Sequence, residues 1–532
     1  MSAVLTSVAA LLLLSCSKQP EADNGTLKVA FGKDNTAFVS LDPFQVWWIE
    51  HRIVLRNVAE SLTDQDPATG AIIPWLAKSW EISPDGLEYT FTLRDDVTFS
   101  NGSKFDASAV KTAFDADKAL VEKLPTVFGA TYLSGYDHAD ILDDHRIRLV
   151  LARPNGGFLQ ATSTTNLAIL APESYARSPE ERSRGAIIGT GPFTLERYTP
   201  EVGLTLVKRK GYGWPSRVVK NPGEAKVERI EVSYIAEDTV RNGKFLQGSV
   251  DIIWPRAPFP DADLNLLKQG GATIESRSLP GPSLNLFPNT RNGRTLSDPV
   301  VRQAVQKAID RPSYARTVYN PDFPVVEGPF DKTTPYFRSQ KAKLVYDPAG
   351  AERLLDGAGW KKGTDGFRSK DGKRLVLRIN SQTDTPGNVL LQDQLRKVGI
   401  DVQIVVLVPG EYAAAIKAGK YDLTGSYMTR GDPVILQTIL DPRYSRGSAL
   451  ATNAFTPDLL KKAQHLFDAG LITSDPAKRA EAYGALQDLL IDQSIAFPVY
   501  ERIWQAALSK NVKGFAWTAE GFASFNDLEI KR

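Results

Sequence analysis

Hydrophobic and polar residues alternate most regularly between residues 74 and 110. Trp80 and Ile82 are separated by a polar residue, and the apolar residues at 89, 91 and 93 alternate in the same way, as in half-buried strands. Between the two runs, Pro84 and Gly86 supply the fixed φ and the positive φ of a tight turn. Asp106 precedes an alanine-rich segment and can cap a helix there. The pattern predicts a β-hairpin followed by a helix.

Further along the chain, short apolar strands alternate with helical patterns, most clearly between residues 375 and 423. Strands are predicted at 375–379, 400–406 and 421–423, with helices at 388–398 and 411–418 between them. This alternation favours parallel βαβ units. Asp298-Pro299 has the residues of a helix N-cap and first turn. Apolar residues at helical spacing predict another helix over 49–62.

Composition is that of an ordinary globular protein: 42% of the 532 residues are hydrophobic and 24% are charged. This length allows two or three hydrophobic cores. The 64 Lys and Arg residues nearly balance the 62 Asp and Glu residues, and the net charge of +2 gives no case for binding nucleic acid or an acidic membrane surface. Beyond the N-terminus, no apolar run reaches the roughly 18–20 residues that cross a bilayer.

Residues that usually carry catalysis or bind metals are few. None of the four histidines is paired with another at a helical metal-ligand spacing. His138 and His145 enclose three aspartates, which leaves two interpretations open: a metal site or a solvated acidic loop. The Gly-rich segment 189–192 has the flexibility of a phosphate loop, but it lacks the Lys-Ser/Thr ending, and Pro192 removes a donor. We expect no enzyme activity, no metal and no cofactor.

The single cysteine, Cys16, follows an apolar run over residues 4–14 and a small residue, Ser15. Residues 13–16 resemble the bacterial lipobox, in which the cysteine thiol is acylated and becomes the mature N-terminus. Two acyl chains give stable anchoring. Leu14 is bulkier than usual, and no basic residue precedes Lys18, so we expect the true start upstream of Met1. The alternative is an ordinary signal peptide followed by a buried cysteine.

Several motifs together resemble one family. They are Leu41-Asp42-Pro43, the stretch from Leu76 to Val110, Gly189–Phe193, Gly248–Asp251, and the helix from Val301-Arg302-Gln303-Ala304 to Ala308-Ile309-Asp310-Arg311. In combination they look like the peptide/nickel class, family 5, of extracytoplasmic solute-binding proteins, which serve ABC importers and include oligopeptide- and dipeptide-binding proteins. One departure is Ala109, which stands where the family usually has Asp.

The resemblance implies an α/β fold of the type II periplasmic-binding-protein kind. Such a fold has two α/β lobes joined by a hinge, here with an extra inserted domain, and solute is enclosed between the lobes. The expected divisions are a signal peptide over 1–15, a lipidated tether over 16–26, lobe I over 27–62, 189–283 and 500–532, the inserted domain over 63–188, and lobe II over 284–499.

The implied function is that of a lipoprotein receptor of an ABC import system. We expect it to capture a peptide or peptide-like small solute, to deliver this solute to the permease subunits, and to act as a monomer without nucleic acid. Its expected location is extracytoplasmic, anchored to the bacterial membrane by lipid. The alternatives are an extracytoplasmic hydrolase and a chaperone-like binder on the same scaffold.

Two segments are expected to contact the solute by resemblance, together with one separate aromatic residue. The first segment follows the Leu-Asp-Pro turn, and the second follows the strand that ends near Leu423. Adjacent tryptophans in the first would be costly if exposed, which favours a ligand wall. The predicted ligand-binding residues are Gln45, Val46, Trp47, Trp48, Trp254, Tyr427, Met428, Thr429, Arg430 and Asp432.

Thr429 occupies the position at which peptide-binding members carry an Asp that pairs with the free amino terminus. A hydroxyl can hydrogen-bond an ammonium but cannot neutralise it. Arg430 follows and offers a fork of donors suited to a carboxylate or phosphate. We therefore expect an anionic or N-terminally blocked solute: a blocked peptide, an opine-like or sugar-phosphate conjugate, or an anionic metal chelate. The alternative is that Arg430 pairs with Asp432 or Asp441 and faces water.

Overall fold

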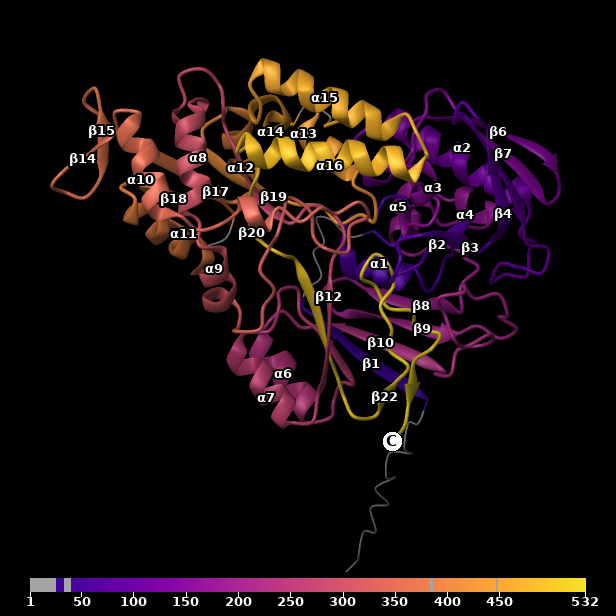
Figure 1. The fold of residues 1–532 in the computed structure, drawn as a ribbon. Coiled ribbons are helices and arrows are strands. Elements are labelled where there is room, and N and C mark those ends of the chain that lie inside the picture. The colour runs from indigo at the N-terminus through magenta and orange to yellow at the C-terminus, as the bar shows by residue number, and fades with distance from the viewer. Residues whose placement is uncertain (1–24, 33–39, 383–385, 446–447) are drawn as a thin grey trace, which may run out of the picture.

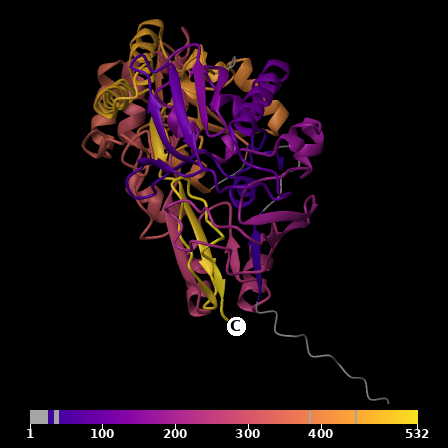
Figure 2. The same ribbon diagram turned by 90° about the vertical axis from the view of Figure 1, so that its right-hand side faces the viewer.

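Three β-sheets organise the protein, whose computed structural model describes residues 25–32, 40–382, 386–445 and 448–532. A seven-stranded sheet forms the lower part in Figure 1. A five-stranded sheet and a four-stranded sheet lie above it, on the left and right, each with its own helices. Figure 2 shows the molecule from the side of the four-stranded sheet, with the C-terminus at the lower end.

The seven-stranded sheet, which we call the lobe I sheet, takes its strands from distant parts of the chain. Its central strand β1 pairs in parallel with β10 and β11, and the remaining pairs are antiparallel. β1 is buried along most of its length, which fits the apolar residues Leu27, Val29, Ala30 and Phe31, while Lys28 is only half-buried. In order across the sheet the strands are β12 (Thr273–Ser278), β21 (Ile503–Leu508), β11 (Ile252–Trp254), β1 (Thr26–Phe31), β10 (Arg229–Tyr234), β9 (Gly203–Lys208) and β8 (Phe193–Thr199). Its helices are α1 (Ile49–Leu55), α6 (Asp238–Leu246) and α7 (Asp261–Gln269).

The five-stranded sheet forms the core of what we call lobe II. β17 pairs in parallel with both β18 and β19, as the alternation of strands and helices predicts. The expected N-cap at Asp298 is present, because its side chain accepts a hydrogen bond from the Val300 N–H. The strands in order are β18 (Asp401–Val406), β17 (Val376–Ser381), β19 (Leu423–Ser426), β13 (Leu284–Pro288) and β20 (Phe497–Tyr500).

Helices surround this sheet, and two long ones lie across the top of the molecule in Figure 1. The two long helices are α15 (Pro457–Leu471) and α16 (Pro476–Asp492). The other helices of lobe II are α8 (Pro299–Ala308), α9 (Arg311–Val318), α10 (Pro348–Gly357), α11 (Pro386–Lys397), α12 (Pro409–Lys417), α13 (Ile435–Leu440) and α14 (Ala449–Asn453). A small exposed sheet contains β14 (Lys361–Lys362), β15 (Arg368–Lys370) and β16 (Lys373–Arg374). Short 3₁₀ turns occur at Thr295–Ser297 and Lys341–Lys343.

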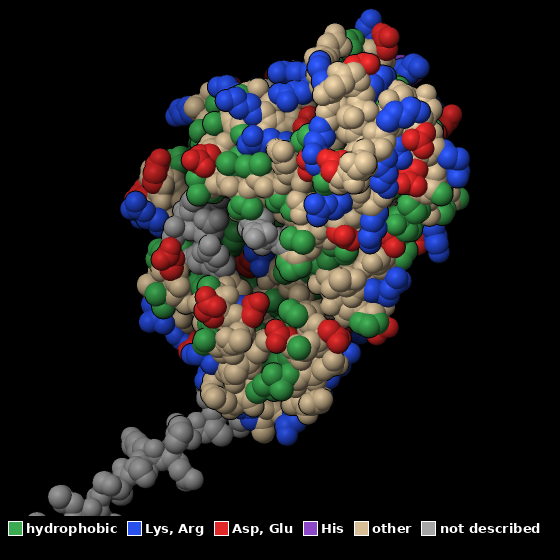
Figure 3. Space-filling view, turned by 90° about the vertical axis from the view of Figure 1, so that its left-hand side faces the viewer, with side chains coloured by type: hydrophobic (Ala, Val, Ile, Leu, Met, Phe, Trp, Pro, Cys, Tyr) green, Lys and Arg blue, Asp and Glu red, His purple; other side chains and the backbone are tan. Residues whose placement is uncertain are grey.

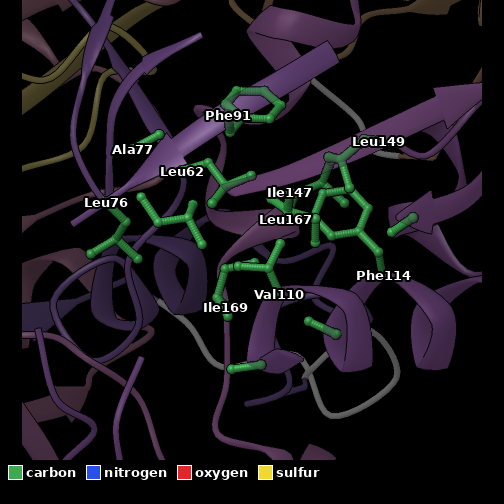
Figure 4. Close-up of a cluster of buried hydrophobic side chains, with 14 of the residues drawn as sticks. Leu62, Leu76, Ala77, Phe91, Val110, Phe114, Ile147, Leu149, Leu167 and Ile169 are labelled. Carbon is green, nitrogen blue, oxygen red and sulfur yellow. The ribbon is translucent and has the colours of Figure 1, made fainter. Parts of the chain in front are cut away.

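The four-stranded antiparallel sheet belongs to the part we call the inserted domain. The predicted hairpin is β4–β5, closed by a turn in which Gly86 has φ +71°. Asp106 caps α2 by accepting from the Ala109 N–H at 2.9 Å. Figure 4 shows apolar side chains from the sheet and α2 in one core, with Phe91 facing Leu62 and Val110. The strands are β4 (Ala77–Ile82), β5 (Glu88–Leu93), β7 (Arg146–Leu151) and β6 (Tyr136–Asp143), and the helices are α2 (Ala107–Lys123), α3 (Phe158–Ala161), α4 (Pro172–Tyr175) and α5 (Pro179–Ser183).

Smaller elements connect these parts. They are β2 (Thr63–Gln65) paired with β3 (Ile72–Pro74), β22 (Val512–Lys513) paired with β23 (Glu529–Ile530), and 3₁₀ turns at Phe128–Thr131 and Thr165–Leu167. The chain passes between lobes I and II twice, from β12 to β13 and from β20 to β21. Within the described ranges, no helix combines the length and the apolar character needed to cross a membrane.

The helix predicted over 49–62 is wrong in its extent, because α1 ends at Leu55. The reason is a competing set of backbone partners. The Gly191 N–H donates to the Val58 carbonyl at 2.9 Å, and the Phe193 N–H donates to the Asn57 carbonyl at 3.1 Å. Carbonyls that accept from the returning strand cannot also continue the helix ladder. The segment after α1 therefore joins α1 to the start of β8.

Candidate functional site

A cavity of about 590 Å³, which we call the inner cavity, lies where lobe I, lobe II and the inserted domain meet. Lobe I contributes Trp48 and Arg256, lobe II contributes Tyr427 and Thr429, and the inserted domain contributes Phe128. Figure 3 shows the molecule hollowed between its upper and lower parts. A solute in this cavity contacts both lobes.

The loop before α1 holds two tryptophans at the cavity. The Asp42 carbonyl accepts from the N–H groups of Gln45 and Val46, and the Asp42 carboxylate accepts from the Gln45 amide at 2.7 Å. Val46 is completely buried in the lobe I core and anchors the loop. Trp47 and Trp48 follow and both line the inner cavity. The predicted contact of Val46 with solute is therefore wrong, because its side chain points into the core.

Arg256 lies on one wall, in the segment after β11. Its guanidinium carbon lies 3.7 Å from the centre of the Trp48 ring, and Nη1 contacts both Glu50 carboxylate oxygens at 3.1 Å. Glu50 is fully buried, whereas the Arg256 side chain is 43% exposed. The ring and the carboxylate fix the guanidinium, because stacking and ion pairing act from different sides.

Arg502 lies at the second crossing between the lobes. Nε donates to Asp331 at 2.7 Å, Nη1 donates to the Thr429 hydroxyl at 2.8 Å, and Nη2 donates to the Pro280 carbonyl at 3.0 Å. Burial raises the pKa of the Asp331 carboxyl to about 8, although the charge of the Arg502 guanidinium acts in the opposite direction. These contacts join the crossing, the segment after β19 and the segment after β12 in one network.

Arg52 of α1 is the third arginine of the inner cavity, and it is almost completely buried. Its Nη2 donates to Glu520 at 2.6 Å and to the Tyr132 hydroxyl at 3.3 Å. Its Nε is buried without a hydrogen-bond partner in the described part of the chain. A buried donor without a partner is costly, so a polar group of a bound solute would be favoured nearby.

The inner cavity presents three arginines and, among the residues that the structure describes, no Asp or Glu side chain. The carboxylates of Glu50, Asp331 and Glu520 lie behind the cavity wall. Tyr319 and Tyr500 also line the cavity, and burial raises the pKa of both phenols, so they remain neutral at ordinary pH. The chemistry of the wall favours an anionic or neutral group over a cationic one.

A second hollow of about 450 Å³, which we call the outer cavity, adjoins the first. Both cavities are lined by Trp47, Phe128 and Met428. Trp47 is 52% exposed and its ring stacks on Phe128, with the ring centres 5.9 Å apart. Gln45 also lines the outer cavity. The remaining described wall carries hydroxyl and apolar side chains and no charged group.

Arg430 does not reach either cavity, and the predictions for it and for Asp432 are wrong. Arg430 is 1% exposed and donates to Gln160 of the inserted domain at 3.0 Å. Its carbon lies 4.6 Å from the centre of the Tyr132 ring, and burial lowers its pKa. Asp432 instead forms a buried two-pronged ion pair with Arg479, with both N–O distances 2.8 Å. Burial raises the pKa of Asp432, but the Arg479 charge outweighs this effect and the pKa is lowered.

Trp254 is also placed elsewhere than expected. It is 1% exposed and packs in the lobe I core, with its ring centre 5.5 Å from that of Trp504 and 5.2 Å from that of Trp517. It ends β11, and its neighbour Arg256 turns to the cavity instead. Of the predicted set, Trp47, Trp48, Tyr427, Met428 and Thr429 line the inner cavity, and their contact with solute stays a prediction.

Several cavity residues were not predicted from the sequence. The most important are Arg52, Arg256 and Arg502, joined by Tyr319, Tyr500 and Trp504. Arg256 and Arg502 each lie two residues beyond the end of an apolar strand, β11 and β20, and Arg502 also lies at a crossing between the lobes. That position is a usable signal, because ligands of α/β proteins collect at strand ends. Among the described residues, no three His, Cys, Asp or Glu side chains gather as a metal site.

Comparison with known proteins identifies the family. The sequence model described as bacterial extracellular solute-binding proteins, family 5 Middle, matches residues 71–446, which is more than half of the chain. The protein belongs to this family of ABC solute-binding proteins.

Individual relatives agree over nearly the whole chain. A dipeptide-binding protein of Escherichia coli K12 is 25% identical over 99% of this chain and 96% of its own. The glutathione-binding protein GsiB of the same strain is 24% identical over 99% of this chain and 98% of its own. The crystal structure of NikA from Brucella suis in complex with Fe(III)-EDTA has a TM-score of 0.81 and 25% identity, covering 95% of this chain and all of NikA.

These findings confirm three predictions. The fold is of the type II periplasmic-binding-protein kind, with α/β lobes. Like its relatives, the protein is a solute-binding protein and not an enzyme. It belongs to a family whose members act outside the cytoplasm.

Proposed function

We propose that the protein captures a peptide-like solute in the inner cavity and delivers it to the permease subunits of an ABC importer. The observation that carries the proposal is the shared wall, in which lobe I supplies Trp48 and Arg256 and lobe II supplies Tyr427 and Thr429. A solute that contacts both lobes stabilises the closed arrangement over any arrangement in which they separate. The dipeptide- and glutathione-binding relatives support a peptide-like solute.

The proposed solute carries no free ammonium group at Thr429. The family position for a carboxylate is occupied by this threonine, whose hydroxyl already accepts a hydrogen bond from Arg502 at 2.8 Å. An ammonium group there would face a guanidinium instead of a counter-ion. An N-terminally blocked or anionic solute avoids this cost. Arg430 contributes nothing to this preference, because its side chain is buried away from the cavity.

Native mass spectrometry tests the receptor function on full-length protein purified from its own source. We expect a small co-purified solute, which is recovered chemically unchanged and raises the melting temperature when it is added back. At a hundredfold excess over Kd the stabilisation is about 2.7 kcal/mol. Tyr427→Ala should weaken binding, whereas Tyr346→Ala, which changes a tyrosine outside both cavities, should not.

Two results would contradict the receptor proposal. The first is a protein that retains no solute and shows no melting-temperature shift with any member of a peptide and peptide-conjugate library. The second is chemical turnover of a bound solute, which would favour the hydrolase alternative. Shifts caused only by unfolded proteins would favour the chaperone-like alternative.

The proposed receptor is a monomer held at the outer face of the membrane by lipid on Cys16, which lies outside the described residues. Cys16→Ala should release the protein from the membrane fraction or block its processing, because each buried acyl CH₂ contributes about 0.8 kcal/mol to anchoring. Solute affinity should stay unchanged. Fractionation followed by intact-mass measurement checks both points. A variant that is correctly processed and still membrane-bound would rule the lipid anchor out.

A further inference from the structure

We infer that the solute carries an acidic group, recognised by the Arg256 guanidinium in the inner cavity, and an uncharged second part that lies in the outer cavity. This inference rests on the proposed function and specifies the class of solute.

Arg256 offers an unused hydrogen-bonding edge. Its Nη1 is occupied by Glu50, whereas Nε and Nη2 have no hydrogen-bond partner among the described residues. The two free N–H groups on this edge point in the same direction and match the two oxygens of a carboxylate. Trp48 on one face and the buried Glu50 hold the guanidinium in place. The edge is therefore oriented before a solute arrives, which lowers the entropic cost of binding.

The other charges of the inner cavity favour the same class of solute. Arg52 and Arg502 line the wall, and their carboxylate partners Glu520 and Asp331 lie behind it. No Asp or Glu side chain lines the described wall, so a cationic group would lose its hydration without gaining a counter-ion. A carboxylate or phosphate instead meets the positive ends of three ion pairs.

The outer cavity selects the second part of the solute. It shares Trp47, Phe128 and Met428 with the inner cavity, so a solute longer than the inner cavity extends past these side chains. Its described wall holds hydroxyl groups such as those of Thr126, Thr131 and Thr438, but no charged side chain. A second charge would be desolvated there without compensation. An uncharged polar or aromatic group fits, since the aromatic rings supply apolar faces.

Blocked dipeptides that differ by one functional group test the inference on the full-length protein. The acidic probe is N-acetyl-Glu-Phe-amide, and its neutral counterpart of nearly identical shape is N-acetyl-Gln-Phe-amide. A cationic probe, Lys-Phe-amide, and a doubly acidic probe, N-acetyl-Glu-Glu-amide, complete the set. Calorimetry should give the acidic probe at least about tenfold tighter binding than its neutral counterpart. The cationic and doubly acidic probes should bind more weakly than the acidic one.

Variants assign the preference to Arg256. Arg256→Gln should remove most of the difference between the Glu and Gln probes. Because Arg256→Gln also removes the ion pair with the buried Glu50, Arg256→Lys provides a second variant that keeps the charge but lacks the two-pronged edge. Arg256→Lys should reduce the affinity difference between the Glu and Gln probes, while its melting temperature without ligand stays close to that of wild type. Arg217→Gln changes an exposed arginine outside both cavities and should have no effect.

Three results would overturn the inference. They are equal binding of the Glu and Gln probes by wild type, a Glu preference that survives in both Arg256 variants, and tightest binding of the cationic or doubly acidic probe. Wild type that binds only neutral, N-terminally blocked peptides would overturn it while leaving the proposed function intact. Wild type that binds no peptide of any charge class would remove the peptide-like solute of the proposed function as well.

Discussion

Glu60 is a fully buried carboxyl group in the segment after α1, surrounded by neutral donors. It accepts from the Tyr212 hydroxyl at 2.5 Å and from the Trp214 indole N–H at 3.0 Å. Burial raises its pKa to about 8, although these hydrogen bonds and the charge of Arg209 act in the opposite direction. The folded protein therefore holds a proton on Glu60 at pH values at which the unfolded chain has lost it.

This difference gives a pH-dependent stability. Because the folded-state pKa is raised, the contribution is fully present below about pH 4.5 and is lost as pH rises through about 8. Within this window, wild type should lose up to about 1.4 kcal/mol of unfolding free energy per pH unit relative to Glu60→Gln. Urea unfolding at several pH values measures the difference. The exposed Glu81→Gln should follow wild type, and a Glu60→Gln curve parallel to wild type would contradict the argument.

Individual side chains were harder to place from the sequence than strands or helices. Thr429, in the segment that the motif indicates, lines the inner cavity, and its contact with solute stays a prediction; the next residue, Arg430, points away from the cavity. Its partner Gln160 is 270 positions away in the chain. Likewise, Arg256 is oriented by Glu50, which is 206 positions away. No local pattern encodes such pairs, so the sequence indicates which segments lie at the site but not which side chains in them face the cavity.

At the scale of elements, local patterns carried more information. The β4–β5 hairpin and the caps of α2 and α8 depend on residues within a few positions of each other, and the structure contains all of them. The α11 helix, predicted over 388–398, extends over Pro386–Lys397, and Gly399 follows with φ +87°. By contrast, the length of α1 is set by distant residues: the N–H groups of Gly191 and Phe193 donate to the carbonyls just beyond the end of the helix. Elements were predictable where their determinants are local.

Across the whole molecule, Arg430 joins lobe II to the inserted domain. Its guanidinium donates to the Gln160 side chain and to the Gly157 carbonyl in buried contacts, and to the Thr131 carbonyl in a partly buried one. Nearby, the Gln65 amide donates to the Gly431 carbonyl at 3.1 Å. These contacts hold the segment after β19 against the inserted domain and so fix one wall of the cavities.

Removing this contact should affect stability and not charge selectivity. Arg430→Met removes this donor from the Gln160 side-chain oxygen and from the carbonyls of Thr131 and Gly157, of which Gly157 keeps its bond from the Ala161 N–H, and the loss should lower the unfolding free energy by about 2–4 kcal/mol. The ratio of acidic to neutral probe binding should remain that of wild type. The matched control is Arg153→Met, an exposed arginine that stacks on Tyr444 across the same interface at 5.0 Å and should cost less than about 1 kcal/mol. If Arg430→Met kept the unfolding free energy of wild type but lost the preference for the acidic probe, Arg430 would be a ligand-binding residue after all.

The ion pairs behind the inner cavity have a consequence for how quickly a solute is caught. Seen from bulk water, Arg52, Arg256 and Arg502 are each nearly cancelled by their own carboxylate. The net field outside falls off steeply, and physiological salt screens what remains within about 8 Å. An acidic solute is therefore not steered toward the opening from a distance, and its encounter rate should vary little with ionic strength. Discrimination between solutes then resides in how long each one stays, because the guanidinium groups act only at contact.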